Sequence, residues 1–213
     1  MDQNTNIEHL GSGRVPDLIE DELEVTTLEV NDDALKLETF QETDMVEWVD
    51  IIAIDEVTGE QAVIGQSTRS AMRLHKLLHK ATYLIVHDSN NNILVQKRTM
   101  NKDYYPGYWD AAAGGVVQEN EDWYVSMKRE AEEELGITDI PFVDHGEFYF
   151  TDEEHYILGR LYSCIATGPF ALQSSEIEQV DWVGTDDIFN RQSEFTPDSI
   201  FALTKWNSRN DLS

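Results

Sequence analysis

The sequence is poor in the features that mark several common protein classes. Among its 213 residues only Cys164 is a cysteine, so no internal disulfide can form and a reducing compartment is expected. It contains no run of about 18 or more apolar residues, which argues against a membrane span. The N-terminus is polar and acidic, unlike the basic and then apolar start of a signal peptide. We therefore expect a soluble, cytoplasmic protein.

Basic residues are also scarce. The chain has 15 Lys and Arg against 42 Asp and Glu, which gives a formal net charge of −27. Proteins that bind nucleic acids or anionic membranes by charge need clustered cations. We therefore expect neither nucleic acid nor membrane as a partner. An anionic small molecule remains compatible with this charge when cations mediate its binding.

The acidic residues are unevenly distributed along the chain. Residues 1–45 contain 13 Asp and Glu against Arg14 and Lys36, for a net charge of −11. Their few apolar residues bury too little surface to fold strongly alone. We expect residues 1–45 to be an acidic, partly flexible N-terminal extension and residues 46–210 to form the folded domain. A partner-binding role for this acidic arm is the alternative interpretation.

The rest of the sequence mixes short strands with separate helices. Strands are predicted at 48–54, 62–64, 83–86, 93–95, 148–150 and 156–158. Helices are predicted from a cap at Ser67 or Thr68 through Met72, Leu74 and Leu78, over 120–135 with a stop at Gly136, and from Thr185 and Thr196-Pro197. This order lacks regular strand–helix–strand alternation, so an α+β fold with a mixed sheet is expected.

The helix at 120–135 carries an unusual group of acids. Glu130, Glu133 and Glu134 stand at i, i+3 and i+4, which places them within an arc of about 100°. An adjacent apolar stripe is formed by Trp123, Met127, Ala131 and Leu135. Carboxylates crowded beside a buried stripe repel one another, and a divalent cation such as Mg²⁺ would relieve that repulsion. A solvated acidic face is the alternative.

The wider spacing favours the metal interpretation. Residues 115–137 read GVVQENEDWYVSMKREAEEELGI and fill every defined position of the Nudix box, from Gly115 through Glu121 and Arg129 to Gly136. The chain thus resembles the Nudix hydrolases. That resemblance implies a mixed β-sheet sandwiched between helices, with the box as a catalytic loop–helix–loop. In this setting Glu121 in the first helical turn would pair with Arg129.

The same resemblance implies a metal-dependent hydrolysis. Glu130, Glu133, Glu134 and the carbonyl of Gly115 would hold Mg²⁺ or Mn²⁺, with Arg129 counted in the catalytic set. Glu133 or Glu134 would act as the base that activates water, and the residues do not decide between them. The substrate would be a small, nucleotide-derived diphosphate, whose charge the metal neutralises. The resemblance also allows a homodimer, which is common in the family.

The resemblance extends outside the box, to about three quarters of the chain. Segments such as HKATYLIVHD, ILVQKRT, PGYWDAAAGGVV and EFTPDS are similar to a bacterial Nudix subfamily labelled YfcD, which is related to the type I isopentenyl-diphosphate isomerases. In those isomerases a basic pair contacts the diphosphate. It matches Arg98 and Lys102 here, with Lys97 beside them.

An isomerase-like activity is nevertheless the weaker alternative. The isomerase's catalytic cysteine and a metal-binding histidine fall on Gly114 and Val116. Its earlier histidine pair falls on Met72 and His79, and its carboxylate pair lies near Ile157 and Gly159. A non-catalytic binding module is a third alternative, which has no evident need for three clustered carboxylates.

Other candidates carry less weight. His75 and His79 have a helical spacing that would suit Zn²⁺, but no third ligand accompanies them. The aromatic loop at 99–109 would stack on a base or sugar, or pack on the domain. Additional acids that would serve as a base, or simply lie on turns and the surface, are Glu153, Glu154, Glu176 and Glu178.

Overall fold

The computed structural model describes residues 47–55 and 57–210. The strands are β1 (Trp48–Ile54), β2 (Gln61–Thr68), β3 (His79–His87), β4 (Ile93–Arg98), β5 (Trp109–Asp110), β6 (Val143–Thr151), β7 (Tyr156–Ile165) and β8 (Ile177–Val183). The helices are α1 (Arg69–Leu74), α2 (Trp123–Leu135), α3 (Thr185–Asn190), the 3₁₀ turn η1 (Gln192–Glu194) and α4 (Pro197–Asn210). The expected acidic extension lies outside the described residues and stays a prediction, as does the boundary at residue 46.

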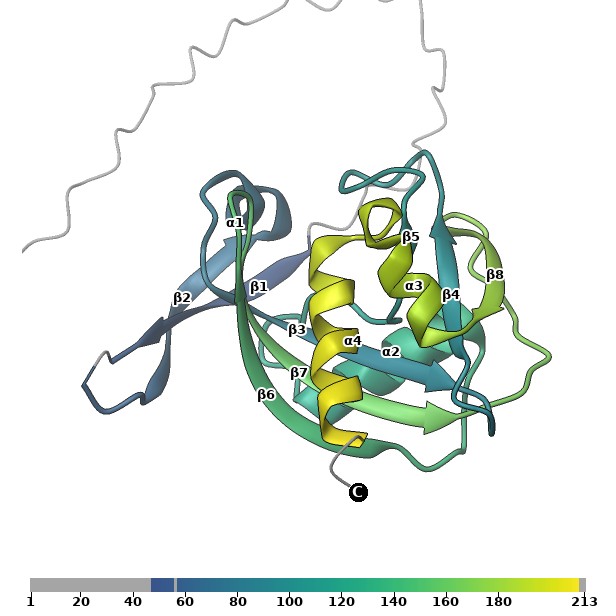
Figure 1. Ribbon diagram of the computed structural model, residues 1–213. Helices are drawn as coiled ribbons and strands as arrows, with labels where there is room; N and C mark the ends of the chain where they lie inside the picture. Colours follow the sequence, from purple (N-terminus) through teal and green to yellow (C-terminus); the bar gives the residue numbers. More distant parts are fainter. Residues whose placement is uncertain (1–46, 56, 211–213) are drawn as a thin grey trace, which may run out of the picture. The chain divides into compact units, whose positions relative to one another are not determined.

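The eight strands form one mixed sheet, as expected (Figure 1). At its centre β3 runs parallel to β7 in a register that extends from His79 opposite Ile157 to His87 opposite Ile165. β6 pairs with β7 antiparallel, and β4 pairs antiparallel with β5 and β8. β1 and β2 form an antiparallel hairpin that joins β3 through the pairing of Ile51 with His79.

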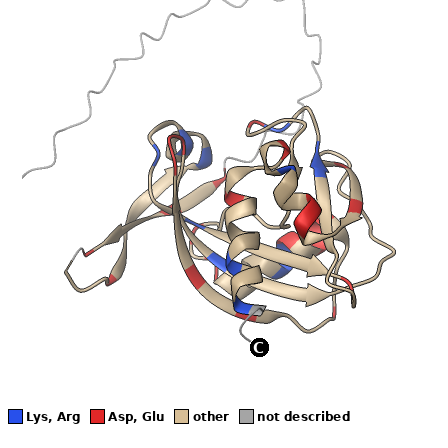
Figure 2. Ribbon diagram, viewed as in Figure 1, with Lys and Arg blue, Asp and Glu red and all other residues tan. Residues whose placement is uncertain are grey.

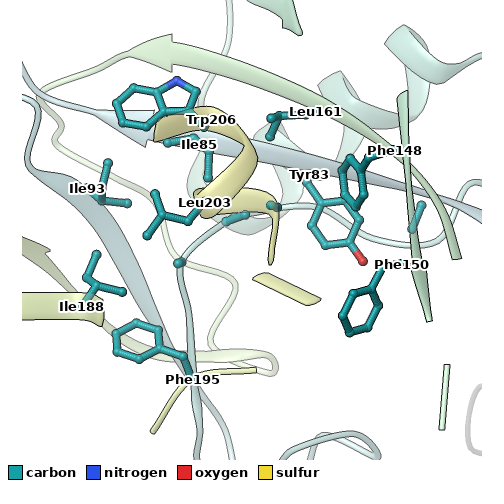
Figure 3. Packing of buried hydrophobic residues seen from close by; sticks show 14 of the residues in the cluster. Tyr83, Ile85, Ile93, Phe148, Phe150, Leu161, Ile188, Phe195, Leu203 and Trp206 are labelled. Atoms are coloured by element: carbon teal, nitrogen blue, oxygen red, sulfur yellow. The ribbon is translucent and has the colours of Figure 1, made fainter. Parts of the chain in front are cut away.

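Alternate residues of β3 point into two separate cores, because successive side chains of a strand face opposite sides of the sheet. Tyr83 and Ile85 pack in a cluster with Leu203 and Trp206 of α4 (Figure 3). Leu84 packs on the other side, in a cluster with the buried face of α2. The sheet therefore lies between α2 and α4, which confirms the predicted sandwich (Figure 1).

The first helix is shorter than predicted. Thr68 caps it as expected, with its hydroxyl accepting from the amide of Ala71 at 3.2 Å. The prediction that it continues through Leu78 is wrong, because the helix ends at Leu74 and Lys76 takes a left-handed φ of 50°. His79 consequently begins β3, so it does not share a helix face with His75 as the zinc hypothesis required.

β2 lies at the end of the strand order and is mostly exposed. Its sequence, QAVIGQST, has no charged residue, and Val63 and Ile64 are among its exposed side chains. Within the described part of the chain no strand pairs with its outer edge. Among the same residues, no helix is long and apolar enough to cross a membrane.

Candidate active site

α2 is fixed at both ends and along one side. Asp122 caps its start, with a carboxylate oxygen accepting from the amide of Tyr124 at 2.8 Å. Gly136 follows its last residue with a left-handed φ of 66°, a conformation that glycine adopts at low cost. The predicted apolar stripe is confirmed at Met127, Ala131 and Leu135, which are buried. This packing sets the rotation of the helix and thereby the direction of its glutamates.

Glu134 points from α2 to the loop that precedes it. This loop runs beside β3, with the amide of Leu84 donating to the carbonyl of Ala113 at 2.7 Å. One carboxylate oxygen of Glu134 accepts from the amide of Gly114 at 3.1 Å. The side chain is buried, and burial, with the charge of Glu130 adding to it, raises the pKa of Glu134 to about 8. Glu134 is therefore the most strongly perturbed carboxyl of the box.

Glu130 approaches the same loop at Gly115. A Cβ placed on Gly115 would lie 2.6 Å from a carboxylate oxygen of Glu130, so any side chain at this position would displace the carboxylate from its present place. Burial raises the pKa of Glu130 as well. The carbonyl of Gly115, a predicted metal ligand, accepts from the amide of Thr82 at 2.9 Å and, at a longer 3.5 Å, from the hydroxyl of the same residue.

Arg129 joins the carboxylates of the box. Its Nε and Nη2 donate to the two oxygens of Glu121 at 2.9 and 3.0 Å, which confirms the predicted pair. Its Nη1 donates to Glu130 at 2.8 Å and to Glu133 at 3.1 Å. Glu121 precedes the cap residue Asp122, so its predicted place in the first helical turn is wrong. The hydrogen bonds with Glu121 raise the pKa of Arg129 above its usual value.

The chemistry of these groups suits a hard divalent cation. Within the described residues no three acidic, histidine or cysteine side chains converge as a metal cluster, because Arg129 contacts Glu130 and Glu133 while Glu134 contacts Gly114. Yet the space beside Gly115 is kept free of any Cβ, and carboxylate oxygens are the ligands that Mg²⁺ prefers. Glu130, Glu133 and Glu134 therefore fit the role of ligands.

A cleft of about 1390 Å³ opens beside this site. Five of the chain's 15 basic residues line it: Arg69, Arg73, Lys76, Arg98 and Lys102. Figure 2 shows these basic segments at α1 and at the end of β4. The box glutamates do not line the cleft themselves, but the charge of Arg69 counteracts the effect of burial on the pKa of Glu130, and Lys102 does so at Glu134. The cleft and the box are thus electrostatically coupled.

The three predicted substrate-binding cations do not all come together. Arg98 and Lys102 line the cleft, whereas Lys97, next to Arg98 on β4, borders a different and smaller pocket. The Nζ of Lys97 lies 5.3 Å from the centroid of the Trp109 ring. Arg98 is already engaged, since Nη1 donates to Asp110 at 2.6 Å and both Nε and Nη2 donate to the carbonyl of Tyr104. Lys102 forms an ion pair with Glu176.

Two residues of the cleft were missed as binding candidates. Arg69 and Arg73 stand four residues apart on α1, whose basic character is visible in the sequence but whose position beside the box is not. His155 also gains partners that the sequence did not reveal. Its Nδ1 lies 2.7 Å from Asp152 and 3.2 Å from the hydroxyl of Tyr104.

The aromatic loop packs largely on itself. Tyr105 makes edge-on contacts with Tyr104 and Tyr108, at centroid distances of 4.4 and 4.8 Å. Trp109 begins β5. Of the acids kept as further candidates, Glu153, Glu154 and Glu176 line the cleft, whereas Glu178 lies in β8. Stacking of the loop on a base stays a prediction.

Comparison with known proteins places this arrangement in a family. A model of the NUDIX domain matches residues 77–203. A protein of Yersinia pestis described as an uncharacterised Nudix hydrolase is 52% identical over 167 residues, covering 78% of this chain and 89% of that protein. The uncharacterised Nudix hydrolase YfcD of Escherichia coli K12 is 51% identical over 164 residues, covering 77% and 88%.

Solved structures agree at the level of the fold. The crystal structure of DR0079 from Deinococcus radiodurans has a TM-score of 0.64 at 19% identity, covering 75% of this chain and 98% of that chain. The MutT protein from Methanosarcina mazei has a TM-score of 0.55 at 22% identity, covering 62% and 95%. With the NUDIX match and the YfcD-type relatives, these findings establish that the chain belongs to the Nudix family and is a Nudix hydrolase.

Proposed function

We propose that this Nudix hydrolase cleaves a diphosphate linkage in a small, nucleotide-derived substrate with the help of Mg²⁺ or Mn²⁺. The observation that carries the proposal is the placement of Glu130 and Glu134 against the two glycines of the preceding loop. Two acidic groups held there at the cost of burial need a function that compensates for it. Binding a divalent cation is that function.

The cation would be held by Glu130, Glu133 and Glu134, and when bound it would neutralise diphosphate charge and favour the ionised form of water. Arg129 keeps two of these carboxylates oriented before binding, because its Nη1 reaches Glu130 and Glu133 together. Lys102, on the neighbouring cleft, supplies positive charge for the phosphates. Glu133, with an exposed side chain, and the buried Glu134 both remain candidates for the base.

The geometry weighs against an isomerase-like activity. The position that matches the isomerase's cysteine is Gly114, which has a φ of 134°. A Cβ there would lie 2.1 Å from the carbonyl oxygen of Thr82, so this backbone does not accept a cysteine. Ile157, near the position of the isomerase's carboxylate pair, is buried among apolar residues. The acid–base groups of that reaction therefore have no equivalents at these positions.

The test is product release from a panel of nucleoside diphosphate derivatives, dinucleotides, CoA and prenyl diphosphates, with Mg²⁺, with Mn²⁺ and with a chelator. Wild-type protein should turn over one compound class only when metal is present. Glu130→Gln and Glu134→Gln should each lower kcat by about 100-fold or more. Glu132→Gln is the matched control, because Glu132 is an exposed acid of the same helix outside the carboxylate group.

Unchanged turnover in both Glu130→Gln and Glu134→Gln would show that the box does not carry the chemistry. Comparing Glu133→Gln with Glu134→Gln over pH then assigns the base, since only loss of the base removes the acidic limb of the rate profile. Prenyl diphosphate that is rearranged and not hydrolysed would restore the isomerase alternative. Metal binding without any turnover would favour a binding module.

A further inference from the structure

The cleft gathers positive charge in a molecule that has little of it. Arg69, Arg73 and Arg98 line one cavity, although the chain carries a net charge of −27. Burial lowers the pKa of the Arg73 guanidinium, and the like charges of Arg69 and Arg98 lower it further. Like charges held together are unfavourable unless anions compensate them. Five acids line the same cleft, namely Glu47, Asp103, Glu153, Glu154 and Glu176, so what matters for an anion is which cations these acids leave without a close partner.

Hydrogen-bonding groups on α1 are left over for a ligand. Nη1 of Arg69 binds Glu47 at 2.6 Å, but its Nε is buried and has no acceptor within the described residues. Among residues 47–55 and 57–210, the one ion pair of Arg73 is a 3.8 Å contact with Asp103, whose side chain is 91% exposed, and such a pair contributes little. Arg98, in contrast, uses all three of its side-chain nitrogens within the protein.

The two arginines of α1 stand at different distances from the box. The start of α1 is tied to the box through β1, because the amide of Arg69 donates to the carbonyl of Glu47 at 2.9 Å and the amide of Glu119 donates to the carbonyl of Trp48 at 3.0 Å. Arg73 lies one turn farther along the helix. The two residues lie at i and i+4 on one helix face, which separates them by about 6 Å along the helix axis. That is more than the roughly 3 Å between the phosphorus atoms of one diphosphate. Arg73 therefore reaches beyond a diphosphate held at the box.

We infer that Arg73, assisted by Arg69, forms a second anion subsite that selects diphosphate substrates carrying an additional phosphomonoester group. A guanidinium suits this task, because its planar fork binds two phosphate oxygens at once. The inference rests on the proposed function, because it takes the box as the first subsite, at which the diphosphate binds. Both arginines precede the NUDIX match at 77–203, so the selectivity would come from a segment outside the matched domain.

The test compares ligands that differ only by one phosphate: CoA with 3′-dephospho-CoA, and NADPH with NADH. Dissociation constants are measured by calorimetry on the full chain, with Mg²⁺ and separately with a chelator. In at least one pair, wild type should bind the phosphorylated member about tenfold more tightly. Arg73→Gln should reduce that ratio to about one, and Arg73→Lys should leave an intermediate ratio, because it keeps the charge and loses the fork.

Arg191→Gln is the matched control, since Arg191 is a partly exposed arginine with a comparable 3.4 Å contact to Glu194 outside the cleft. It should keep the wild-type ratio, and thermal melts should verify that all variants fold. The inference is overturned if wild type shows no preference in either pair, including by absence of binding, or if Arg73→Gln keeps the preference. Failure of the proposed function would give a different result: the phosphorylated ligand would still bind more tightly, but no ligand would be hydrolysed in the presence of metal.

Discussion

At the scale of the residue, the site depends on two glycines, whose lack of a side chain leaves space for neighbouring groups. Gly114 lets the backbone pass the carbonyl of Thr82, and Gly115 leaves room for the carboxylate of Glu130. The two glycines act differently. Gly114 needs a φ that other residues rarely adopt, whereas Gly115 needs only the space. Substitution of Gly115 therefore perturbs the site with little backbone strain.

We predict that Gly115→Ala lowers kcat/KM by about 100-fold, because the new methyl group displaces Glu130 from its place beside the loop. Steady-state kinetics at saturating Mg²⁺ measures the effect. Gly65→Ala is the control, since a Cβ at Gly65 meets nothing within 4 Å, and its rate should match wild type. Wild-type activity in Gly115→Ala would mean that Glu130 works from another position.

The burial of His79 should make the stability of the fold depend on pH. Burial is the main cause that lowers the pKa of His79 to about 4, while a hydrogen bond with the carbonyl of Leu77 and the charge of Arg73 have smaller, opposed effects. The unfolded chain binds this proton below a pH of about 6.5, and the folded chain binds it only near pH 4. The folded state thus loses stability as the pH falls from 6.5 to 4, by about 3 kcal/mol in total.

Urea unfolding of wild type and His79→Gln across this pH range checks the prediction. The difference between their free energies of unfolding should shrink as the pH decreases, because the many carboxylates titrate alike in both proteins. Parallel curves for the two proteins would refute the assignment to His79. Circular dichroism at pH 7 verifies that the variant folds.

At the scale of the element, α2 could be predicted almost completely from sequence, because its signals are local. The apolar stripe, the stop at Gly136 and the carboxylate arc all lie within the helix and its ends. The predicted start was three residues early, since Asp122 caps the helix from outside. β8 was not predicted, because its sequence IEQVDWV is half exposed and its strand character depends on the distant pairing with β4.

The site divides in the same way between local and distant information. The grouping of Glu130 and Glu134 follows from helical spacing, and their approach to Gly114 and Gly115 follows from the short loop that precedes α2. The position of α1 beside the cleft does not follow from spacing, since it depends on how the β1–β2 hairpin joins the sheet. Likewise, which of Lys97 and Arg98 faces the cleft depends on how β4 pairs with β5 and β8.

The cap of α2 gives a prediction at this scale. Asp122→Ala removes the acceptor for the amide of Tyr124 and should lower the free energy of unfolding by about 1 kcal/mol. Asp122→Asn keeps an acceptor oxygen and should stay within a few tenths of a kcal/mol of wild type. Urea unfolding measures both variants. Equal loss in both would show that the carboxylate charge, and not the hydrogen bond, stabilises the helix start.

At the scale of the whole molecule, the net charge and the cleft act in opposite directions on an anionic substrate. At about 0.01 M salt the screening length of about 30 Å lets the full charge of −27 repel the substrate. Near 0.15 M the length is about 8 Å, so distant acids are screened and the arginines nearest the substrate, such as Arg73, have the larger effect. We predict that kcat/KM rises several-fold over this range at constant free Mg²⁺ and falls again near 1 M. A monotonic decrease would contradict this balance.

The uncharged outer edge of β2 gives the net charge a second consequence, in the colloidal behaviour of the protein. Edge strands are commonly guarded against pairing between molecules by their own charged side chains, and QAVIGQST has none. Protection against such pairing therefore comes from the net charge of the whole molecule, because like-charged copies repel one another at long range. It vanishes near the sequence pI of about 4.3 and weakens in concentrated salt. We accordingly expect this protein to precipitate on acidification or in concentrated salt, by association of folded molecules through the edge of β2 and without unfolding.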